Sequence, residues 1–325
     1  MKKNTGRFPG KLGALIVSVL IVGLAFAYIG WGDRLGGLAK KLGIEYSRLT
    51  DLYVRKLADG ELEAHFIDVG QGDSILLRSD NTVILIDSGT NDSEEILRRY
   101  LRAFGVKTLD CFICTHPHED HIGGSDMIIN SFEVDRLMLC GSDSASYSLK
   151  KLLDKANRSG VELLEPEYGA KYTIGDITFR VLAPGSGLDT ASNDGSIVVR
   201  VEWGETSFLL AGDAELASES AMLADFPPEE LDSTLLKVGH HGSNTSSGDE
   251  FLAAVSPEWA VISCGRDNDY GHPHREVLNR LEEYGVPEDH ILRTDKNGSI
   301  VFISDGRELY LYGEKSENET EKPAA

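Results

Sequence analysis

Long repetitive or proline-rich stretches are missing from this sequence. It has only ten prolines in 325 residues, no low-complexity block in its middle and no internal repeat at a fixed period. These absences exclude a repeat array and a proline-rich linker protein. With 41% hydrophobic residues, the chain has enough apolar material for one large globular domain or two small ones.

Basic residues are also scarce. There are 32 Lys and Arg against 53 Asp and Glu, so the formal net charge is −21. Such a surface repels polyanions unless cations or local basic patches offset it, and the sequence shows no obvious basic or aromatic groove. Acidity of this kind is commonly just a solubility feature. If the substrate carries phosphate, metal ions must supply much of the attraction.

Only four cysteines are present. Cys111 and Cys114 lie in one apolar run that predicts a buried strand. Residues three apart on a strand point to opposite faces, so this pair should not form a disulfide. Cys140 and Cys264 end other apolar runs. We therefore expect four buried free thiols, although disulfides are common in exported chains.

Near the N-terminus, residues 12–31 form an apolar run of about 20 residues, the length that spans a bilayer as a helix. Basic residues before this run predict a cytoplasmic N-terminus and an extracellular remainder. A cleaved signal peptide is the alternative, because Ala25–Ala27 ("AFA") resembles a cleavage site. The run continues beyond this point to Trp31, which favours an uncleaved anchor.

Five segments are predicted along the chain: a basic N-terminus (1–11), the signal-anchor (12–31), a linker (32–60), a globular domain (61–312) and a polar tail (313–325). In the globular domain, short β-rich runs alternate with amphipathic helical segments. This mixture predicts two β-sheets packed together with helices outside. Polar clusters follow several predicted strands, and loops at one edge of such a sandwich can converge on one site.

The segment "ICTHPHEDHIGG", residues 113–124, carries three histidines and two acids within six residues. His116 and His118 are two apart on an extended segment, so both imidazoles can reach one ion. Asp120 and His121 follow where the chain turns into a helix and can bind a neighbouring ion. Imidazole and carboxylate suit Zn²⁺, and also Mn²⁺ or Fe, so the cluster favours a metal site over a polar turn.

"THPHEDHIGG" resembles the H-x-H-x-D-H signature of the metallo-β-lactamase fold, and the resemblance covers nearly all of residues 61–312. "LIDSG", "LLAGDAE" and "LLKVGHHGS" resemble further motifs of that family in order. The resemblance implies an α/β (α+β) fold, an αββα sandwich with metals at one edge. More narrowly, "HFIDVGQGDSILL", "LKVGHHGSNTSS" and "YGHPHREVLNRL" resemble the C-terminal domain of ComEC/Rec2 family competence proteins. Those proteins carry a multi-helix DNA-uptake channel, which one hydrophobic span cannot form.

The family further implies two divalent metal ions, Zn²⁺ or Mn²⁺. The first ion would be held by His116, His118 and Asp213. The second would be held by Asp120, His121, Asp213 and His240, with Asp213 bridging the two ions. We prefer His240 to His241 because it comes first after the predicted strand. The residues expected to support the site or to contact substrate are Asp68, Asp73, Asp87, His241 and Ser243.

One departure from the family pattern concerns the first ion. Many members place a histidine between the second and fourth motifs, but this sequence has no histidine between His121 and His240. The segment "TASNDGSIVVR" occupies that place. Asn193 or Asp194 can offer an oxygen there, water can fill the position, or the segment is only a turn. Competence-type domains tend to lack this histidine, so the departure agrees with the narrower resemblance. With one ligand fewer, the first site would bind its ion more weakly or would prefer Mn²⁺ to Zn²⁺.

Two such cations activate water as a nucleophile and stabilise developing charge. We expect Asp120 to orient this nucleophile, and His272 or His274 to protonate a leaving oxygen or to bind phosphate. The alternative for this histidine pair is a polar cap on the following helix. Together these features predict a membrane-tethered extracellular phosphodiesterase that acts on DNA. Alternatives are hydrolysis of a wall or lipid phosphodiester, and a non-catalytic accessory protein with a vestigial metal site. The missing histidine disfavours β-lactam cleavage.

Overall fold

The structure is a computed structural model that describes residues 57–140 and 147–312. The predicted signal-anchor at 12–31 and the polar tail at 313–325 lie outside these residues. Within the described ranges, no helix combines the length and the apolar character that crossing a membrane requires.

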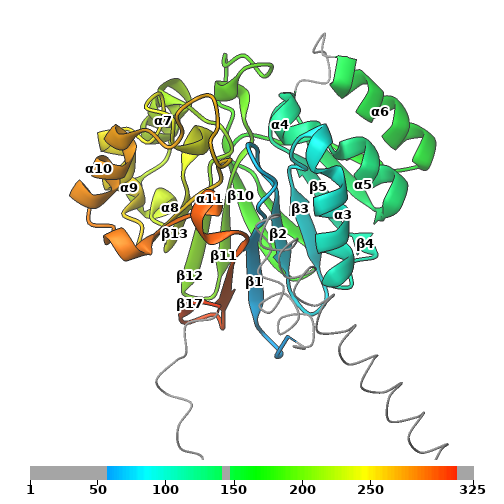
Figure 1. The fold of residues 1–325 in the computed structure, drawn as a ribbon, viewed down its shortest axis with the longest axis horizontal. Helices are drawn as coiled ribbons and strands as arrows, with labels where there is room; N and C mark the ends of the chain where they lie inside the picture. The colour runs from blue at the N-terminus through cyan, green and yellow to red at the C-terminus, as the bar shows by residue number, and fades with distance from the viewer. Residues whose placement is uncertain (1–56, 141–146, 313–325) are drawn as a thin grey trace, which may run out of the picture. The chain divides into compact units, whose positions relative to one another are not determined.

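Two mixed β-sheets pack face to face (Figure 1). The first has eight strands in the order β17-β16-β1-β2-β3-β5-β7-β8. Its strands are β1 (Leu62–Phe66), β2 (Ile75–Arg78), β3 (Val83–Ile86), β5 (Cys111–Cys114), β7 (Arg136–Leu139), β8 (Glu162–Leu164), β16 (Ile300–Ser304) and β17 (Leu309–Leu311). The second has seven strands in the order β15-β14-β13-β12-β11-β10-β9. Its strands are β9 (Lys171–Ile174), β10 (Ile177–Ala183), β11 (Val198–Trp203), β12 (Thr206–Leu210), β13 (Leu235–Lys237), β14 (Trp259–Ile262) and β15 (Ile291–Arg293). A small parallel pair joins β4 (Thr108–Leu109) to β6 (Glu133–Val134).

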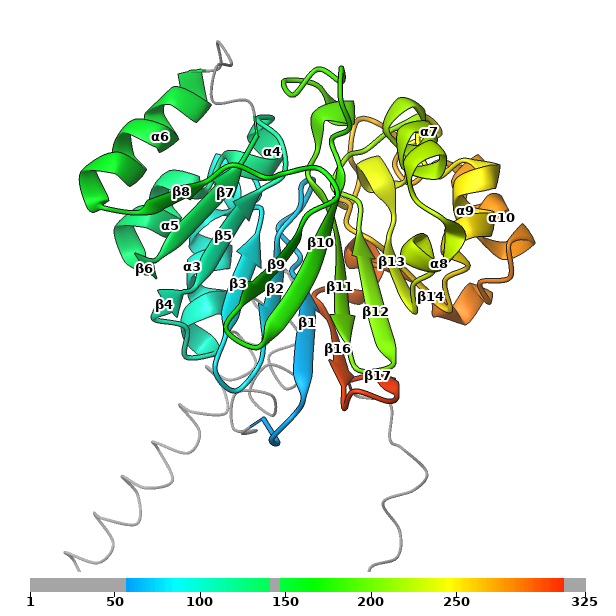
Figure 2. The same cartoon turned by 180° about the vertical axis from the view of Figure 1, so that it is seen from behind.

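Helices cover the outer face of each sheet (Figure 2). The first sheet is flanked by α3 (Glu94–Ala103), α4 (Glu119–Ile122), α5 (Ser125–Ser131) and α6 (Tyr147–Ser159). The second is flanked by α7 (Leu216–Asp225), α8 (Pro228–Leu231), α9 (Asp249–Val255) and α10 (Arg275–Glu283). Short elements complete the chain: α11 (Thr294–Asn297), η1 (Asn91–Ser93), η2 (Asn193–Gly195), η3 (Gly239–Gly242) and η4 (Glu288–His290). The predicted αββα sandwich is confirmed.

Strand β1 shows why the strands of this sandwich are buried on both faces. Leu62, Ala64 and Phe66 point into the core between the sheets. Glu63 and His65 point the other way, and His65 Nδ1 lies 2.9 Å from the hydroxyl of Tyr100 on α3. Because successive side chains of a strand point to opposite faces, β1 packs one set of side chains between the sheets and the other set against α3. The four cysteines are buried free thiols, as predicted.

Parallel pairing brings polar loops to one edge of the sandwich. Strands β3 and β5 are parallel in the first sheet, and β12, β13 and β14 are parallel in the second. The carboxyl ends of parallel strands lie at the same edge, and the loops that follow them begin there. Asp87 directly follows β3, and His116, Asp213 and His240 come two or three residues after β5, β12 and β13.

Candidate metal centre

Asp87 anchors the histidine-rich loop from below. Its carboxylate accepts the Thr115 N–H at 2.8 Å and the Thr115 hydroxyl at 2.7 Å. The same carboxylate lies 2.7 Å from Nδ1 of His121. Its own backbone is left-handed, with φ of 58°, a conformation that costs about 1–2 kcal/mol for a non-glycine residue. These contacts orient the His121 ring so that Nε2 faces the centre.

His116 and His118 lie on the same side of their extended segment. His116 Nε2 is 2.9 Å from His118 Nδ1. On its other edge, His116 Nδ1 lies 3.2 Å from the Thr115 hydroxyl and 3.3 Å from the Ser196 hydroxyl. Burial, followed by the charge of His121, lowers the pKa of His116 well below its usual value. The ring is therefore in the neutral form that a metal ion needs.

One carboxylate oxygen of Asp213 faces four imidazoles. Its Oδ2 lies 3.1 Å from Nε2 of His121, 3.4 Å from Nε2 of His241, and 3.9 Å from Nε2 of both His116 and His240. Its backbone N–H donates to the Ser196 hydroxyl at 3.1 Å, which holds the loop after β12. This central position is the geometry that a bridging carboxylate needs.

One group of possible ligands contains His241, whereas the sequence analysis preferred His240. Ligand atoms of Asp120, His121, Asp213 and His241 all lie within 4.8 Å of one another. His241 Nε2 is 3.2 Å from Asp120 Oδ2. His240 instead lies 2.9 Å from Glu215 through Nδ1 and 3.3 Å from the Asn193 amide nitrogen through Nε2. Both histidines have left-handed backbones, with φ of 44° and 54°, so the order of emergence from β13 does not decide which ring reaches the cluster.

Buried polar atoms without partners test whether divalent cations fit this site. Within the described part of the chain, Asp213 Oδ1, Asn193 Oδ1 and His121 Nε2 are buried and have no hydrogen-bond partner. His121 Nε2 approaches Asp213 without hydrogen-bond geometry. Leaving such groups unsatisfied costs about 1–3 kcal/mol each, so they are explained if a cation binds there. The fold family implies divalent ions, and nitrogen and oxygen donors of this kind suit them.

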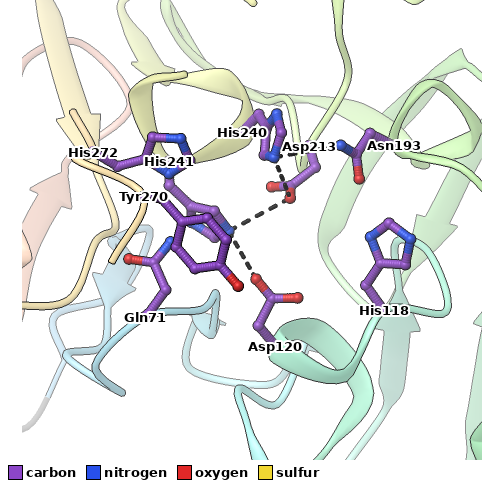
Figure 3. A pocket seen from close by; sticks show the side chains of 9 residues that line it. All are labelled: Gln71, His118, Asp120, Asn193, Asp213, His240, His241, Tyr270 and His272. Carbon is purple, nitrogen blue, oxygen red and sulfur yellow. Dashed lines mark hydrogen bonds and ion pairs between the residues drawn. The ribbon is translucent and has the colours of Figure 1, made fainter. Parts of the chain in front are cut away.

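Asn193 and Asp194 have different surroundings. The side-chain oxygen of Asn193 faces the pocket, as Figure 3 shows. The Asp194 carboxylate instead accepts the N–H groups of Glu215 at 3.2 Å and Ser218 at 2.9 Å, at the start of α7. The structure therefore favours Asn193 as the candidate oxygen donor and gives Asp194 a structural role.

Charges at the cluster are strongly coupled. Burial alone would lower the pKa of His241, but the carboxylates of Asp213, Asp120 and Asp73 raise it to about 9. Burial would raise the pKa of Asp213 and Asp120, but the neighbouring histidines lower both. Without metal, protons on His121 and His241 balance the carboxylates. Cations that replace these protons release them, so metal affinity depends on pH.

A buried ion pair beneath the cluster was missed by the sequence analysis. Lys237 Nζ lies 2.5 Å from Asp73 Oδ2 and donates to the Gly212 carbonyl at 3.0 Å. Both side chains are almost fully buried. Asp73 Oδ1 is also 3.5 Å from His241 Nδ1. The sequence feature that could have indicated a buried ion pair is the lysine at the end of the predicted strand "STLLK".

The hairpin "DVGQGDS" contacts the histidine-rich loop through Gly72. Gly72 has φ of +150°, and a Cβ there would lie 2.4 Å from the carbonyl oxygen of Asp120. The next residue, Asp73, donates its N–H to that same carbonyl at 3.1 Å. The glycine therefore serves both a tight turn and a close approach between two loops.

A cavity of about 180 Å³ opens over the cluster (Figure 3). It is lined by Gln71, His118, Asp120, Asn193, Asp213, His240, His241, Tyr270 and His272. Gln71 and Tyr270 were missed by the sequence analysis, because neither belongs to a metal-ligand pattern. Burial, followed by the charges of His241, His240 and His274, lowers the pKa of His272 to about 4. A ring that is neutral at pH 7 is a poor proton donor, which disfavours the expected role of His272 in protonating a leaving oxygen.

Three predicted site residues do not line the cavity. Asp68 accepts the Gly70 N–H at 3.2 Å and belongs to the hairpin turn. The Ser243 hydroxyl lies 3.0 Å from that of Thr245. The remaining residue, His274, precedes α10, and its Nδ1 accepts the Asn244 N–H at 2.9 Å. Asp68 thus shapes its turn, and the Thr245 hydroxyl that Ser243 contacts lies 3.1 Å from His240 Nδ1. His274 packs edge-on against His272 with ring centres 5.1 Å apart, and its side chain makes no hydrogen bond that caps α10.

An αββα sandwich with imidazoles and carboxylates converging at one edge defines a candidate metal-dependent hydrolase. The sequence profile described as "Metallo-beta-lactamase superfamily" matches residues 67–139 and 175–266. The chain belongs to the metallo-β-lactamase superfamily. Among solved structures, CmlA, a diiron β-hydroxylase from Streptomyces venezuelae, is similar with a TM-score of 0.50 and 15% identity, over 74% of this chain and 53% of that chain. That likeness shows the fold alone.

Several curated relatives are ComEC/Rec2 family competence proteins, which confirms the narrower resemblance. The chain is 34% identical over 269 residues to "ComE operon protein 3" of Bacillus subtilis (strain 168), covering 77% of this chain and 34% of that protein. It is 32% identical over 244 residues to "Competence protein ComA" of Neisseria gonorrhoeae, covering 72% of this chain and 31% of that protein. The chain thus spans about a third of the length of these relatives.

Proposed function

We propose that this protein is a metal-dependent phosphodiesterase that cleaves DNA. The observation that carries the proposal is the Asp213-centred cluster, whose donor atoms lie close enough together to hold a divalent cation. The competence relatives make DNA the substrate to test first. The acidic composition agrees with this scheme, because bound cations would supply the attraction for phosphate that the surface lacks.

One ligand set follows from the distances between its atoms, and the other follows the family pattern. Asp120, His121, Asp213 and His241 would hold one ion. His116, His118 and Asp213 would hold the other, and Asn193 and His240 stand close enough to complete it. The bound ions would supply a nucleophile from water at neutral pH and would stabilise developing charge.

The chain's own residues position the reacting groups. Asp87 orients His121 from behind, and the Ser263 carbonyl, 2.9 Å from Nδ1, orients His241 in the same way. Asp120 faces the cavity with one oxygen directed to His241, so that its other oxygen is available to orient the attacking water. His272 lines the same cavity and can contact a phosphate oxygen through a ring N–H.

A cleavage assay tests the proposal. Purified full-length protein is incubated with Mn²⁺ or Zn²⁺ and single- or double-stranded DNA. We expect cleavage that chelator abolishes and that Asp120→Ala reduces by at least about a hundredfold, the range typical for loss of one electrostatic contact to a transition state. Intact DNA with turnover of bis(p-nitrophenyl) phosphate would instead indicate a smaller phosphodiester, and failure to bind metal would refute an enzymatic role.

The ligand assignment has its own comparison. His241→Ala should reduce the number of bound ions measured by mass spectrometry more than His240→Ala does. Equal losses would contradict the assignment of His241.

We also propose, from the sequence alone, that residues 12–31 tether the protein to the cell membrane with the hydrolase domain outside the cell. The basic residues before this segment support that orientation. Protease accessibility of the domain on intact cells, compared with lysed cells, tests it.

A further inference from the structure

One wall of the cavity carries an exposed aromatic ring that metal binding does not require. Among the described residues, four large hydrophobic side chains are exposed, and Tyr270 is the most exposed at 67%. The other three are Leu163, Leu216 and Tyr310. Only Tyr270 of this set lines the cavity (Figure 3).

Tyr270 ends a column of three rings that leads outward from the metal cluster. His272 stacks on His241 with ring centres 6.1 Å apart and planes at 28°. Tyr270 stacks on His272 with centres 5.5 Å apart and planes at 20°. A ligand bound at His241 is therefore two ring spacings from an open aromatic surface.

The loop that presents this ring is held by one amide. The side-chain oxygen of Asn268 accepts the N–H groups of Tyr270 at 3.2 Å and His272 at 3.0 Å. Its side-chain nitrogen donates to the carbonyls of Gly265 at 2.9 Å and His272 at 2.7 Å. All hydrogen-bonding groups of the amide stay within the loop. The backbone beneath Tyr270 is pre-organised, which lowers the entropic cost of binding a ligand to the ring.

We propose that Tyr270 stacks on the nucleobase beside the phosphodiester that is cleaved, and that the DNA is single-stranded there. This inference rests on the proposed DNA phosphodiesterase function and names the form of its substrate. Every base offers a π-face, so stacking tolerates any sequence. In a duplex those faces are covered by neighbouring bases. Stacking also requires no positive charge, which suits a chain with a net charge of −21.

The test compares a base-bearing strand with one that lacks bases. Full-length protein with Mn²⁺ cleaves oligothymidylate or an abasic tetrahydrofuran strand of equal length, and kcat and KM are measured for each. Tyr270→Leu should raise KM for oligothymidylate about 5- to 100-fold, the range for loss of one base–aromatic stack, and leave the abasic strand unchanged. Tyr270→Phe, which keeps the ring, should stay within about threefold of wild type. Tyr310→Leu, on β17, is the matched control and should change neither substrate.

Several outcomes would overturn the inference. These are equal effects of Tyr270→Leu on both strands, no effect on either strand, a loss in Tyr270→Phe as large as in Tyr270→Leu, or equally efficient cleavage of duplex DNA. If wild-type protein cleaves neither these strands nor duplex DNA, the proposed function fails, and fluorescence anisotropy decides the stacking separately. Preferential binding of oligothymidylate that disappears in Tyr270→Leu would then support stacking, and no preference would refute it.

Discussion

Lys237→Met should lower the free energy of unfolding of the metal-free protein far more than the substitution of an exposed lysine does. The variant removes the cation that lies 2.5 Å from Asp73 and leaves that carboxylate buried near Asp87 and His241. Removing one partner of a buried ion pair costs about 3–5 kcal/mol. For a domain of this size, that corresponds to a fall in Tm of roughly 6–20 °C.

The measurement is urea-induced unfolding in the presence of chelator, because bound metal would otherwise add its own stabilisation. Lys171→Met is the matched control. Lys171 pairs with Glu202 at 3.0 Å, but the two side chains are 46% and 42% exposed, so its loss should cost less than about 1 kcal/mol.

A double variant separates charge from packing. Asp73→Asn removes the buried charge that Lys237→Met leaves unpaired, so the two substitutions together should cost less than the sum of their separate effects, by at least about 2 kcal/mol. The reasoning is refuted if Lys237→Met is no worse than Lys171→Met, or if the two buried substitutions are additive.

Three further predictions follow from the geometry. Burial raises the pKa of Glu219 from 4.5 to about 7, so the folded state binds more protons than the unfolded chain between these values and stability falls as pH rises through them. Glu219→Gln should reduce this fall, by up to about 3 kcal/mol between pH 5 and 8 in chelator; an unchanged pH dependence would contradict it. Saturating Mn²⁺ or Zn²⁺ should raise the Tm of wild type, and Asp213→Asn should lose most of that rise and bind fewer ions by mass spectrometry; a full rise would exclude a central role for this carboxylate. Gly72→Ala should destabilise the protein more than Gly70→Ala, because a Cβ at 72 meets the Asp120 carbonyl at 2.4 Å and one at 70 meets nothing within 4 Å; equal unfolding midpoints would show that this loop contact yields freely.

Much of the fold was predictable because it depends on local patterns. Alternating apolar residues predicted strands such as β1, and apolar runs predicted that the cysteines are buried. The two-residue spacing of His116 and His118 predicted that their rings share one side, since that follows from extended backbone geometry alone.

The choice between His240 and His241 was not predictable in the same way. Adjacent residues of a regular strand alternate, but these two occupy consecutive left-handed conformations in η3. Such a turn is set by its surroundings, including the hydrogen bond from His241 to the Ser263 carbonyl after β14. A sequence pattern does not specify the backbone angles of such a turn. For the same reason, the sequence did not show where the His274 ring would lie.

The sequence by itself determined the layered fold, the family and the types of ligand, because period, composition and short motifs are local properties. Only the tertiary structure decided which residues meet. Asp120 and His241 are 121 positions apart and come within 3.2 Å. Lys237 reaches Asp73 from the opposite sheet, and Tyr270 reaches the cavity from a loop after β14. These contacts arise where two sheets and their loops pack together, so they depend on the whole sandwich and on no single segment.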